Sequence, residues 1–282
     1  MSGPGATPIS IKLFLTAGSA MGLRTAEISN WSGKALACAR SELNDLAQRD
    51  ESSHPGIYIL IGTDPASGEP AAYVGEAEEV GKRLKQHLDK DFWTQVILFV
   101  SKDENLTKGH IKYLEGKLIT QGQDAGRGVI LNAQASGAKL PEADQAEMDA
   151  FLENMLKLLP VLGSNLFTPA SDAKTRALPK LVCNIKGLTA FGNRTESGFV
   201  VYKGSSAVLT ERKSAGPFIA LRARLVASGV LTLEDDYYVF AKDHEFSSPS
   251  YAAGAVCGGH MNGLTAWKTE AGLTLKQLEE SS

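Results

Sequence analysis

The amino-acid sequence predicts an α+β protein with a large N-terminal domain and a smaller C-terminal domain. Short apolar runs typical of strands alternate with segments whose apolar residues recur at helical spacing. A stretch rich in Ser, Thr, Asn and Pro, at residues 163–179, has the composition of a linker. We therefore divide the 282 residues into an N-terminal domain at 1–163, a linker at 164–180 and a C-terminal α+β domain at 181–282.

The composition is that of a soluble globular protein, with 43% hydrophobic and 22% charged residues. No apolar run approaches the roughly 20 residues that a membrane-spanning helix needs. The first ten residues lack the basic flank and apolar core of a signal peptide, so we expect a cytoplasmic protein without membrane contact. The cysteines, Cys38, Cys183 and Cys257, are far apart and never spaced as Cys-x-x-Cys, which supports neither a disulfide framework nor a zinc site.

Strand and helix patterns alternate along the N-terminal domain. Residues 10–16 predict a strand, Ser41 is a candidate cap for a short helix that ends at Gln48, and two apolar runs predict a hairpin at 56–75. Further along, the patterns predict a helix at 78–90, with Val80, Leu84 and Leu88 on one face, and a buried strand at 93–101. Two more helices are expected after this strand. The first is capped by Thr107, and the second is an amphipathic helix at 141–159 that ends before Pro160.

The C-terminal domain combines strands expected at 198–202, 206–210 and within 237–246 with helices at 217–228 and 249–257. Ser248 is placed to cap the last helix, whose N-terminus would suit a phosphate. Between Arg176 and Arg224 the sequence contains nine Lys or Arg residues and only two acidic residues, a composition typical of proteins that bind a polyanion. The alternative is that this segment is an ordinary solvated surface whose positive charge is balanced by the acidic stretches 141–153 and 234–245.

Two tyrosines mark the predicted hairpin. Because side chains alternate along a strand, Tyr58 and Tyr73 can face the same side of the sheet, opposite Ile57, Ile59 and Ile61. On the following helix Arg83 and His87 lie one turn apart and border the apolar stripe. We therefore expect these four side chains to reach the same face of the sheet.

Glu115 is an anomaly in the helix that follows Thr107. An ideal helix places it about 40° from Ile111 and therefore inside the apolar stripe that includes Leu118. An unpaired buried charge costs several kcal/mol, so the carboxylate needs a cation or several donors. An ion pair with Arg83 inside the core is one explanation, and a bound metal ion is the other.

These residues together resemble the GIY-YIG endonuclease family. The similarity rests on "GIY" at 56–58, "YVG" at 73–75, and the later residues Arg83, His87, Glu115 and Asn132, in that order. It extends over about residues 10–163 and is similar to bacterial proteins of unassigned biological role. The pattern "FSSPSYAAGAVCGGHMNGLTAWK" at 246–268 resembles a small domain of unknown function that follows such nucleases and occurs in restriction and modification proteins.

The resemblance implies a small antiparallel sheet flanked by helices and hydrolysis of a phosphodiester bond with one Mg²⁺ or Mn²⁺ ion. Glu115 would bind the metal, and Tyr58 would activate water. Tyr73 and His87 would order the hydrogen-bond network, Arg83 would contact the scissile phosphate, and Asn132 would hold the site together. A single carboxylate suits a Mg²⁺ ion that keeps most of its waters.

The resemblance also implies DNA as the partner, with RNA less favoured. We expect backbone contacts from basic residues of both domains: Lys82, Lys85, Lys203, Arg212, Lys213, Arg222 and Arg224. Two features depart from the family pattern, because Glu76 stands where many members have Lys and the connection between the two motifs is long. A non-catalytic scaffold that binds nucleic acid or protein therefore remains the alternative function.

Overall fold

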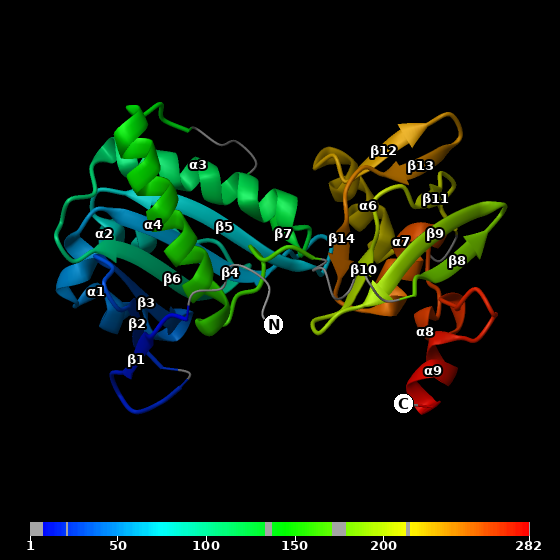
Figure 1. Cartoon of the computed structure of the whole chain (residues 1–282), viewed down its shortest axis with the longest axis horizontal. Coiled ribbons are helices and arrows are strands. Elements are labelled where there is room, and N and C mark those ends of the chain that lie inside the picture. The colour runs from blue at the N-terminus through cyan, green and yellow to red at the C-terminus, as the bar shows by residue number, and fades with distance from the viewer. Residues whose placement is uncertain (1–7, 21, 133–136, 171–178, 213–214, 282) are drawn as a thin grey trace. The chain divides into compact units, whose positions relative to one another are not determined.

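The computed structural model describes residues 8–20, 22–132, 137–170, 179–212 and 215–281. The chain forms two compact units. Unit 1 comprises Met1–Gly62, Ala72–Ile119 and Gln134–Asn165, and unit 2 comprises Thr63–Ala71, Thr120–Ala133 and Leu166–Ser282. Strands and helices occur in both, which confirms the predicted α+β class (Figure 1). No helix of the described segments is long and apolar enough to cross a membrane.

A seven-stranded sheet has the order β1-β2-β3-β6-β4-β5-β7. Its strands are β1 (Ile11–Leu15), β2 (Arg24–Ile28), β3 (Gly33–Ala39), β4 (Gly56–Thr63), β5 (Pro70–Ala77), β6 (Trp93–Ser101) and β7 (Val129–Ile130). The predicted strands near 10–16 and 93–101 and the two arms of the hairpin are present. β6 lies between β3 and β4 and pairs antiparallel with both, which explains why its sequence is an almost continuous apolar run.

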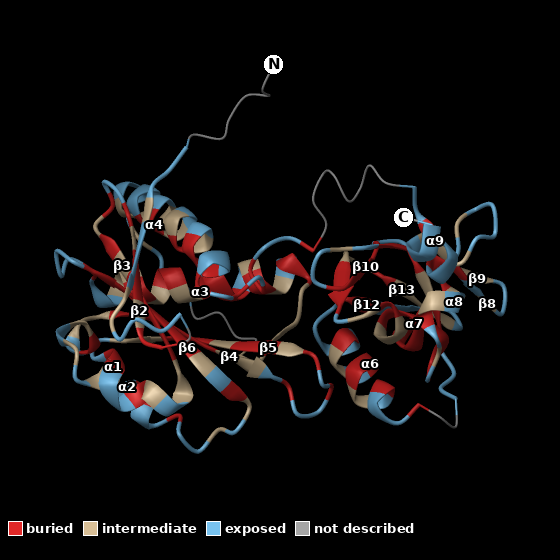
Figure 2. Cartoon of the chain, turned by 90° about the horizontal axis from the view of Figure 1, so that it is seen from below, coloured by how far each residue is buried: buried red, intermediate tan, exposed pale blue. Residues whose placement is uncertain are grey.

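In unit 1, helices lie on both faces of the sheet. The helices α1 (Leu43–Ala47) and α2 (Val80–Lys85) lie on one face, and α3 (Lys108–Ala125) and α4 (Glu142–Val161) on the other (Figure 2). Leu43, Leu46, Val80 and Leu84 pack with Tyr58 and Leu60 of β4 in one buried cluster. Alternation along β4 therefore directs Tyr58 toward α2.

The helix predicted at 78–90 is shorter than expected, since α2 ends at Lys85. Beyond it the backbone tightens, because the N–H groups of His87, Leu88 and Lys90 donate to the carbonyls three residues earlier. Tighter winding advances each residue by about 120° instead of 100°. His87 therefore takes the buried position, with 4% of its surface exposed, whereas Leu88, expected in the apolar stripe, is 46% exposed.

The other helix ends in unit 1 follow local hydrogen bonding. Thr107 caps α3 as predicted, because its Oγ1 accepts from the N–H of His110 at 3.3 Å. Residues 40–42 form a 3₁₀ turn before α1, so Ser41 lies inside that turn and does not cap a helix. α4 continues to Val161 with Pro160 in its last turn, since the N–H of Leu162 still donates to the carbonyl of Leu158.

Unit 2 contains two small sheets in the orders β14-β10-β9-β8 and β11-β13-β12. The strands are β8 (Leu181–Ile185), β9 (Leu188–Arg194), β10 (Phe199–Val201), β11 (Ser206–Val208), β12 (Leu231–Glu234), β13 (Tyr237–Phe240) and β14 (His244–Phe246). The helices are α6 (Pro217–Ala227), α7 (Pro249–Cys257), α8 (Gly263–Ala266) and α9 (Leu275–Ser281). Both helices predicted from the sequence, α6 and α7, are present, as are strands in each of the three predicted stretches.

α7 lies in the core of unit 2. Small residues allow this, because a Cβ on Gly254 would come within 2.2 Å of the Phe218 ring. Ser248 caps the helix as predicted, its Oγ accepting from the N–H of Tyr251 at 3.2 Å. Part of the segment with linker composition is also packed, since Leu166, Phe167 and Ala170 are buried. Residues 171–178 lie outside the described part of the chain.

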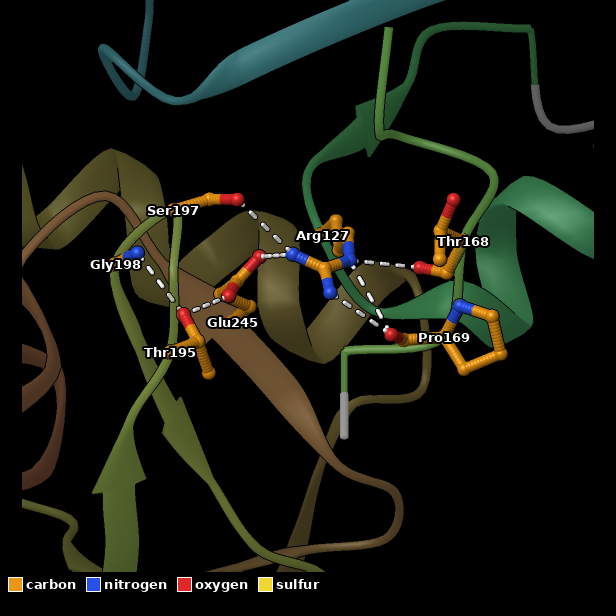
Figure 3. Close-up of polar contacts among 7 residues, drawn as sticks. All are labelled: Arg127, Thr168, Pro169, Thr195, Ser197, Gly198 and Glu245. Carbon is orange, nitrogen blue, oxygen red and sulfur yellow. Dashed lines mark hydrogen bonds and ion pairs between the residues drawn. The ribbon is translucent and has the colours of Figure 1, made fainter. Parts of the chain in front are cut away.

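Arg127 connects segments of unit 2 that are far apart in the sequence (Figure 3). Its guanidinium donates to the carboxylate of Glu245 in β14. It also donates to one hydroxyl and two carbonyls from other segments, those of Ser197, Thr168 and Pro169. The second oxygen of Glu245 accepts from the hydroxyl of Thr195. Both charged side chains are largely buried, with 14% of Arg127 and 5% of Glu245 exposed.

Arg127→Ala should lower the free energy of unfolding by about 3–5 kcal/mol, because it leaves the carboxylate of Glu245 buried without its cation. Chemical denaturation of the full chain measures this loss. Lys276→Ala is the control, since Lys276 pairs with Glu280 at 3.7 Å on an exposed helix face and should change stability by at most about 1 kcal/mol. Equal losses in the two variants would contradict the structural role of Arg127.

Candidate functional site

Tyr58 and His87 form a buried hydrogen-bonded pair. The Tyr58 hydroxyl lies 2.8 Å from Nε2 of His87, and Tyr58 is only 1% exposed. The backbone of His87 is anchored as well, because Nε1 of Trp93 donates to its carbonyl at 3.0 Å. The strand alternation of β4 and the tightened turn after α2 therefore bring together two residues that were expected to reach the same face of the sheet.

Gly75 provides the space for the Tyr58 ring. A Cβ at position 75 would lie 2.3 Å from both the Cζ atom and the hydroxyl oxygen of Tyr58. Real Cβ atoms do not approach other heavy atoms this closely, so any side chain on β5 at this position would push the tyrosine away. The glycine of the second motif is thus explained by packing against the tyrosine of the first.

Tyr73 completes an aromatic cluster, defined here as Tyr58, Tyr73 and His87. Its ring lies 5.1 Å from that of His87 and 6.4 Å from that of Tyr58, measured between centroids. Nζ of Lys90 lies 4.2 Å from the centroid of the Tyr73 ring, a cation–π contact. Tyr73 is half-buried, so the cluster has one member that solvent reaches.

Arg83 lies beside this cluster and is exposed. Its Nη1 donates to Oε1 of Gln86 at 2.6 Å. The nearby Tyr58 hydroxyl raises the pKa of Arg83, and the charge of Glu76 makes a smaller contribution in the same direction. Glu76, the acid that departs from the family pattern, therefore lies within electrostatic reach of the arginine.

At pH 7 the hydroxyl of Tyr58 is protonated and the imidazole of His87 is neutral. Burial raises the pKa of Tyr58 to about 12, and the nearby guanidinium of Arg83 opposes this. Burial also lowers the pKa of His87 to about 4, and the charges of Lys90 and Arg83 lower it further. The imidazole can therefore accept a proton, but two neighbouring cations disfavour its charged form.

Glu115 lies on α3 and is half-buried, whereas Ile111, Leu114 and Leu118 around it are fully buried. Its charge is one of the causes that raise the pKa of Tyr58. The carboxylate is therefore in electrostatic contact with the tyrosine hydroxyl, as a residue of the same site would be. Asn132 is half-buried after β7 and belongs to unit 2, unlike the other five predicted site residues.

The donor set near Glu115 fits one kind of metal ion. Among the described residues, no three His, Cys, Asp or Glu side chains are grouped as metal ligands. A site that needs several protein ligands, as zinc does, therefore has no candidate in this part of the chain. A single half-buried carboxylate suits Mg²⁺, which retains most of its waters and bonds to substrate oxygens.

Several residues expected to contact DNA are accessible. Lys82 and Lys85 are exposed on α2, and Lys82 pairs with Glu79 at 2.6 Å. Lys203 and Arg212 are exposed in unit 2. Lys213 lies outside the described residues.

Arg222 and Arg224 have structural partners. Arg222 is 2% exposed, and its guanidinium donates to the carbonyls of Ala255, Val208 and Leu209. This corrects the expected DNA contact at Arg222, since the buried side chain satisfies backbone carbonyls instead of facing solvent. Arg224 is 39% exposed and donates to Oδ1 of the buried Asp64 at 2.9 Å.

Two residues of the site were not assigned a role from the sequence. Lys90 contacts Tyr73 and acts on His87, and its position three residues after His87 was the only available signal. Gly75 belongs to the motif, but its packing role depends on where the Tyr58 ring lies, which the sequence pattern does not specify.

Residues 181–279 match the family model of a domain of unknown function, DUF4357. This match lies within unit 2 and includes the stretch 246–268, whose pattern resembled a small domain of unknown function. No match to a GIY-YIG nuclease model was found. No curated protein matches the chain, and no solved structure matches it.

Gly75→Ala should destabilise the protein by about 1–3 kcal/mol, because the added methyl group occupies the position of the Tyr58 hydroxyl. Denaturation curves measure the effect. Gly137→Ala is the matched control, since no heavy atom lies within 4 Å of its added Cβ, and it should stay within about 0.5 kcal/mol of wild type. Equal stability of the two variants would show that the ring does not occupy this space.

The pKa of His87, about 4, should shift in opposite directions when a neighbouring cation or a neighbouring anion is removed. Lys90→Gln should raise it by removing a cation, and Asp89→Asn should lower it by removing an anion; NMR titration of the imidazole measures both. Because the folded pKa is below the ordinary value of 6.5, His87 supports stability above pH 6.5, and this support is lost as the pH falls toward 4. A pKa unchanged in both variants would contradict this electrostatic environment.

Proposed function

We propose that the protein is a metal-dependent endonuclease of the GIY-YIG type that hydrolyses phosphodiester bonds of DNA. The observation that carries this proposal is the buried hydrogen bond between Tyr58 and Nε2 of His87, with the guanidinium of Arg83 close enough to lower the pKa of the same hydroxyl. A tyrosine, an acceptor for its proton and a cation for a phosphate are thus present at one place. Water activation and phosphate binding require these three elements.

The charges of the site favour an anionic substrate. Beside the larger effect of burial, Lys90 and Arg83 both lower the pKa of His87, and Asp89 opposes them, so the two cations contribute positive potential at the imidazole. A phosphodiester would compensate this potential, and the exposed guanidinium of Arg83 can form paired hydrogen bonds with phosphate oxygens. The same negative charge would make protonation of His87 less costly when substrate is bound.

Proton transfer follows from the protonation states of the pair. With a pKa of about 12, Tyr58 is not a phenolate at neutral pH and cannot remove a proton on its own. As the attacking water loses a proton to the Tyr58 oxygen, the phenolic proton can pass to Nε2 of His87, 2.8 Å away. Tyr58 then remains neutral throughout the step, which avoids a buried negative charge.

Glu115 would hold the Mg²⁺ or Mn²⁺ ion, which supplies Lewis-acid stabilisation of the charge that develops on the phosphate. Its support is the half-buried carboxylate within electrostatic reach of Tyr58. Exposed Lys82 and Lys85 on α2 could contact the backbone of the same duplex. For the C-terminal domain, Lys203 and Arg212 remain the exposed candidates for DNA contact.

Cleavage of plasmid, linear duplex, single-stranded and branched DNA should require Mg²⁺ or Mn²⁺ and stop in EDTA. Tyr58→Phe should lower the rate by about 10²–10⁴-fold, because it removes the proton-transferring hydroxyl. Arg83→Ala should lower it by about 10²–10³-fold. Glu115→Gln should abolish metal-dependent cleavage while keeping the size of the side chain.

Tyr113→Phe is the matched control. Its hydroxyl donates to Oδ1 of Asp149 at 2.9 Å, away from the aromatic cluster, so cleavage should be unchanged. Wild-type rates in Tyr58→Phe or Glu115→Gln would contradict the assigned roles. If the wild-type protein cuts none of these substrates with either metal, a non-catalytic scaffold replaces the nuclease as the better function.

A further inference from the structure

Unit 2 contains a pocket of about 360 Å³. Its apolar wall comes from the segment 129–131 and from Leu221, Leu225 and Val230. The volume lies at the lower end of the range of small-molecule sites, about 300–1,000 Å³. The pocket therefore suits a small, mostly apolar molecule with at most a few polar atoms.

Two buried polar side chains line the same pocket without hydrogen-bond partners. Glu69 is 0% exposed and His244 is 3% exposed. Among the described residues, no partner meets the geometric criteria of a hydrogen bond to either carboxyl oxygen of Glu69 or to either ring nitrogen of His244. The backbone of Ser247 is near enough to lower the pKa of Glu69. Such groups are rare, because each costs about 1–3 kcal/mol when left unsatisfied.

The charged neighbours of these two groups already have partners. Glu245 repels a charge on Glu69, but it is bonded to Arg127 and Thr195. Arg224 lines the pocket and pairs with Asp64 at 2.9 Å.

On the His244 side, the nearby cation is also engaged. Lys242 lowers the pKa of His244, and its Nζ lies 3.7 Å from Asp124. Neither unsatisfied group therefore has a counter-ion that would hold it in its charged form.

Both groups are neutral at pH 7. Burial raises the pKa of Glu69 to about 8, and the nearby charge of Glu245 contributes to this. Burial lowers the pKa of His244 to about 4, and Lys242 acts in the same direction. A neutral carboxyl group offers one donor and one acceptor side by side, and a neutral imidazole offers one of each. A ligand that matches them has a neighbouring acceptor and donor of its own.

We propose that this pocket binds a single nucleobase, with its hydrogen-bonding edge on Glu69 and His244 and its ring between the apolar side chains. Each nucleobase combines a flat, weakly polar ring with adjacent donor and acceptor atoms, as the wall and the two polar groups require. The base could belong to a free nucleoside or to a nucleotide turned out of a DNA strand.

Calorimetric titration of the full chain with cytidine, adenosine, uridine and guanosine tests the proposal. At least one nucleoside should bind saturably. The analogue of that nucleoside methylated on its donor nitrogen should bind at least about tenfold more weakly, because it leaves an acceptor unsatisfied. Absence of saturable binding by all four would overturn the proposal.

Substitution of Glu69 separates binding from packing. Glu69→Gln keeps a donor beside an acceptor and should retain binding, whereas Glu69→Leu should weaken it at least about tenfold in a protein that remains folded by circular dichroism. In wild type, affinity should fall as the pH rises through about 8, because ionised Glu69 loses its donor. In Glu69→Gln this dependence should disappear. Undiminished affinity in folded Glu69→Leu would refute the assigned contact.

A competition arm identifies the source of the base. If a single-stranded oligonucleotide displaces the nucleoside and an abasic oligonucleotide does not, the pocket takes bases from a polynucleotide. If neither oligonucleotide competes, the pocket takes the free nucleoside. Either of these two results supports the proposed nucleobase pocket. Tyr58→Phe should bind nucleoside like wild type, so failure of the nuclease proposal leaves this test intact. Equal displacement by the abasic strand would place binding elsewhere.

Discussion

The ion pair between Arg127 and Glu245 is the interaction on which unit 2 depends. Arg127 comes from the segment Thr120–Ala133, and its guanidinium is bonded at three places to the segment Leu166–Ser282: at residues 168–169, at Ser197 and at Glu245. A buried pair of this kind gives little net stability compared with apolar packing, but it is specific about which groups meet. It also holds the carboxylate of Glu245 where its charge acts on Glu69. Burial remains the largest cause of the raised pKa of Glu69, and the ion pair adds to it by fixing the position of the Glu245 charge.

In unit 1 the comparable constraint is spatial. The Tyr58 ring occupies the place that a side chain at position 75 would take, and this contact directs its hydroxyl to His87. Lys90 and Arg83 then act on the imidazole from the outside. The arrangement combines a buried hydrogen-bonded pair with two cations at its edge, the half-buried Lys90 and the exposed Arg83. Two different physical effects, packing and long-range charge, thus meet at His87.

Local patterns predicted most of the elements, because alternation, helical spacing and capping residues such as Thr107 and Ser248 act over a few residues. They failed just beyond the end of α2. The backbone winds more tightly after Lys85, which buries His87 and exposes Leu88. They also failed for Arg222, whose partners are backbone carbonyls far away in the sequence. Tyr58, Tyr73, Arg83 and His87 were found by motif order, and the structure brings them together. The pocket with Glu69 and His244 gave no local signal at all, since its lining comes from three separate segments.

The contact between Gly75 and Tyr58 restricts how this sequence can evolve. As long as an aromatic side chain stands at position 58, any substitution at position 75 meets its ring. The reverse does not hold, because a smaller residue at position 58 would vacate the space and release position 75 from selection. Among homologues, glycine at 75 should therefore be lost only in lineages that have first lost the tyrosine. The order of substitutions along a phylogeny would then record when a lineage gave up this arrangement.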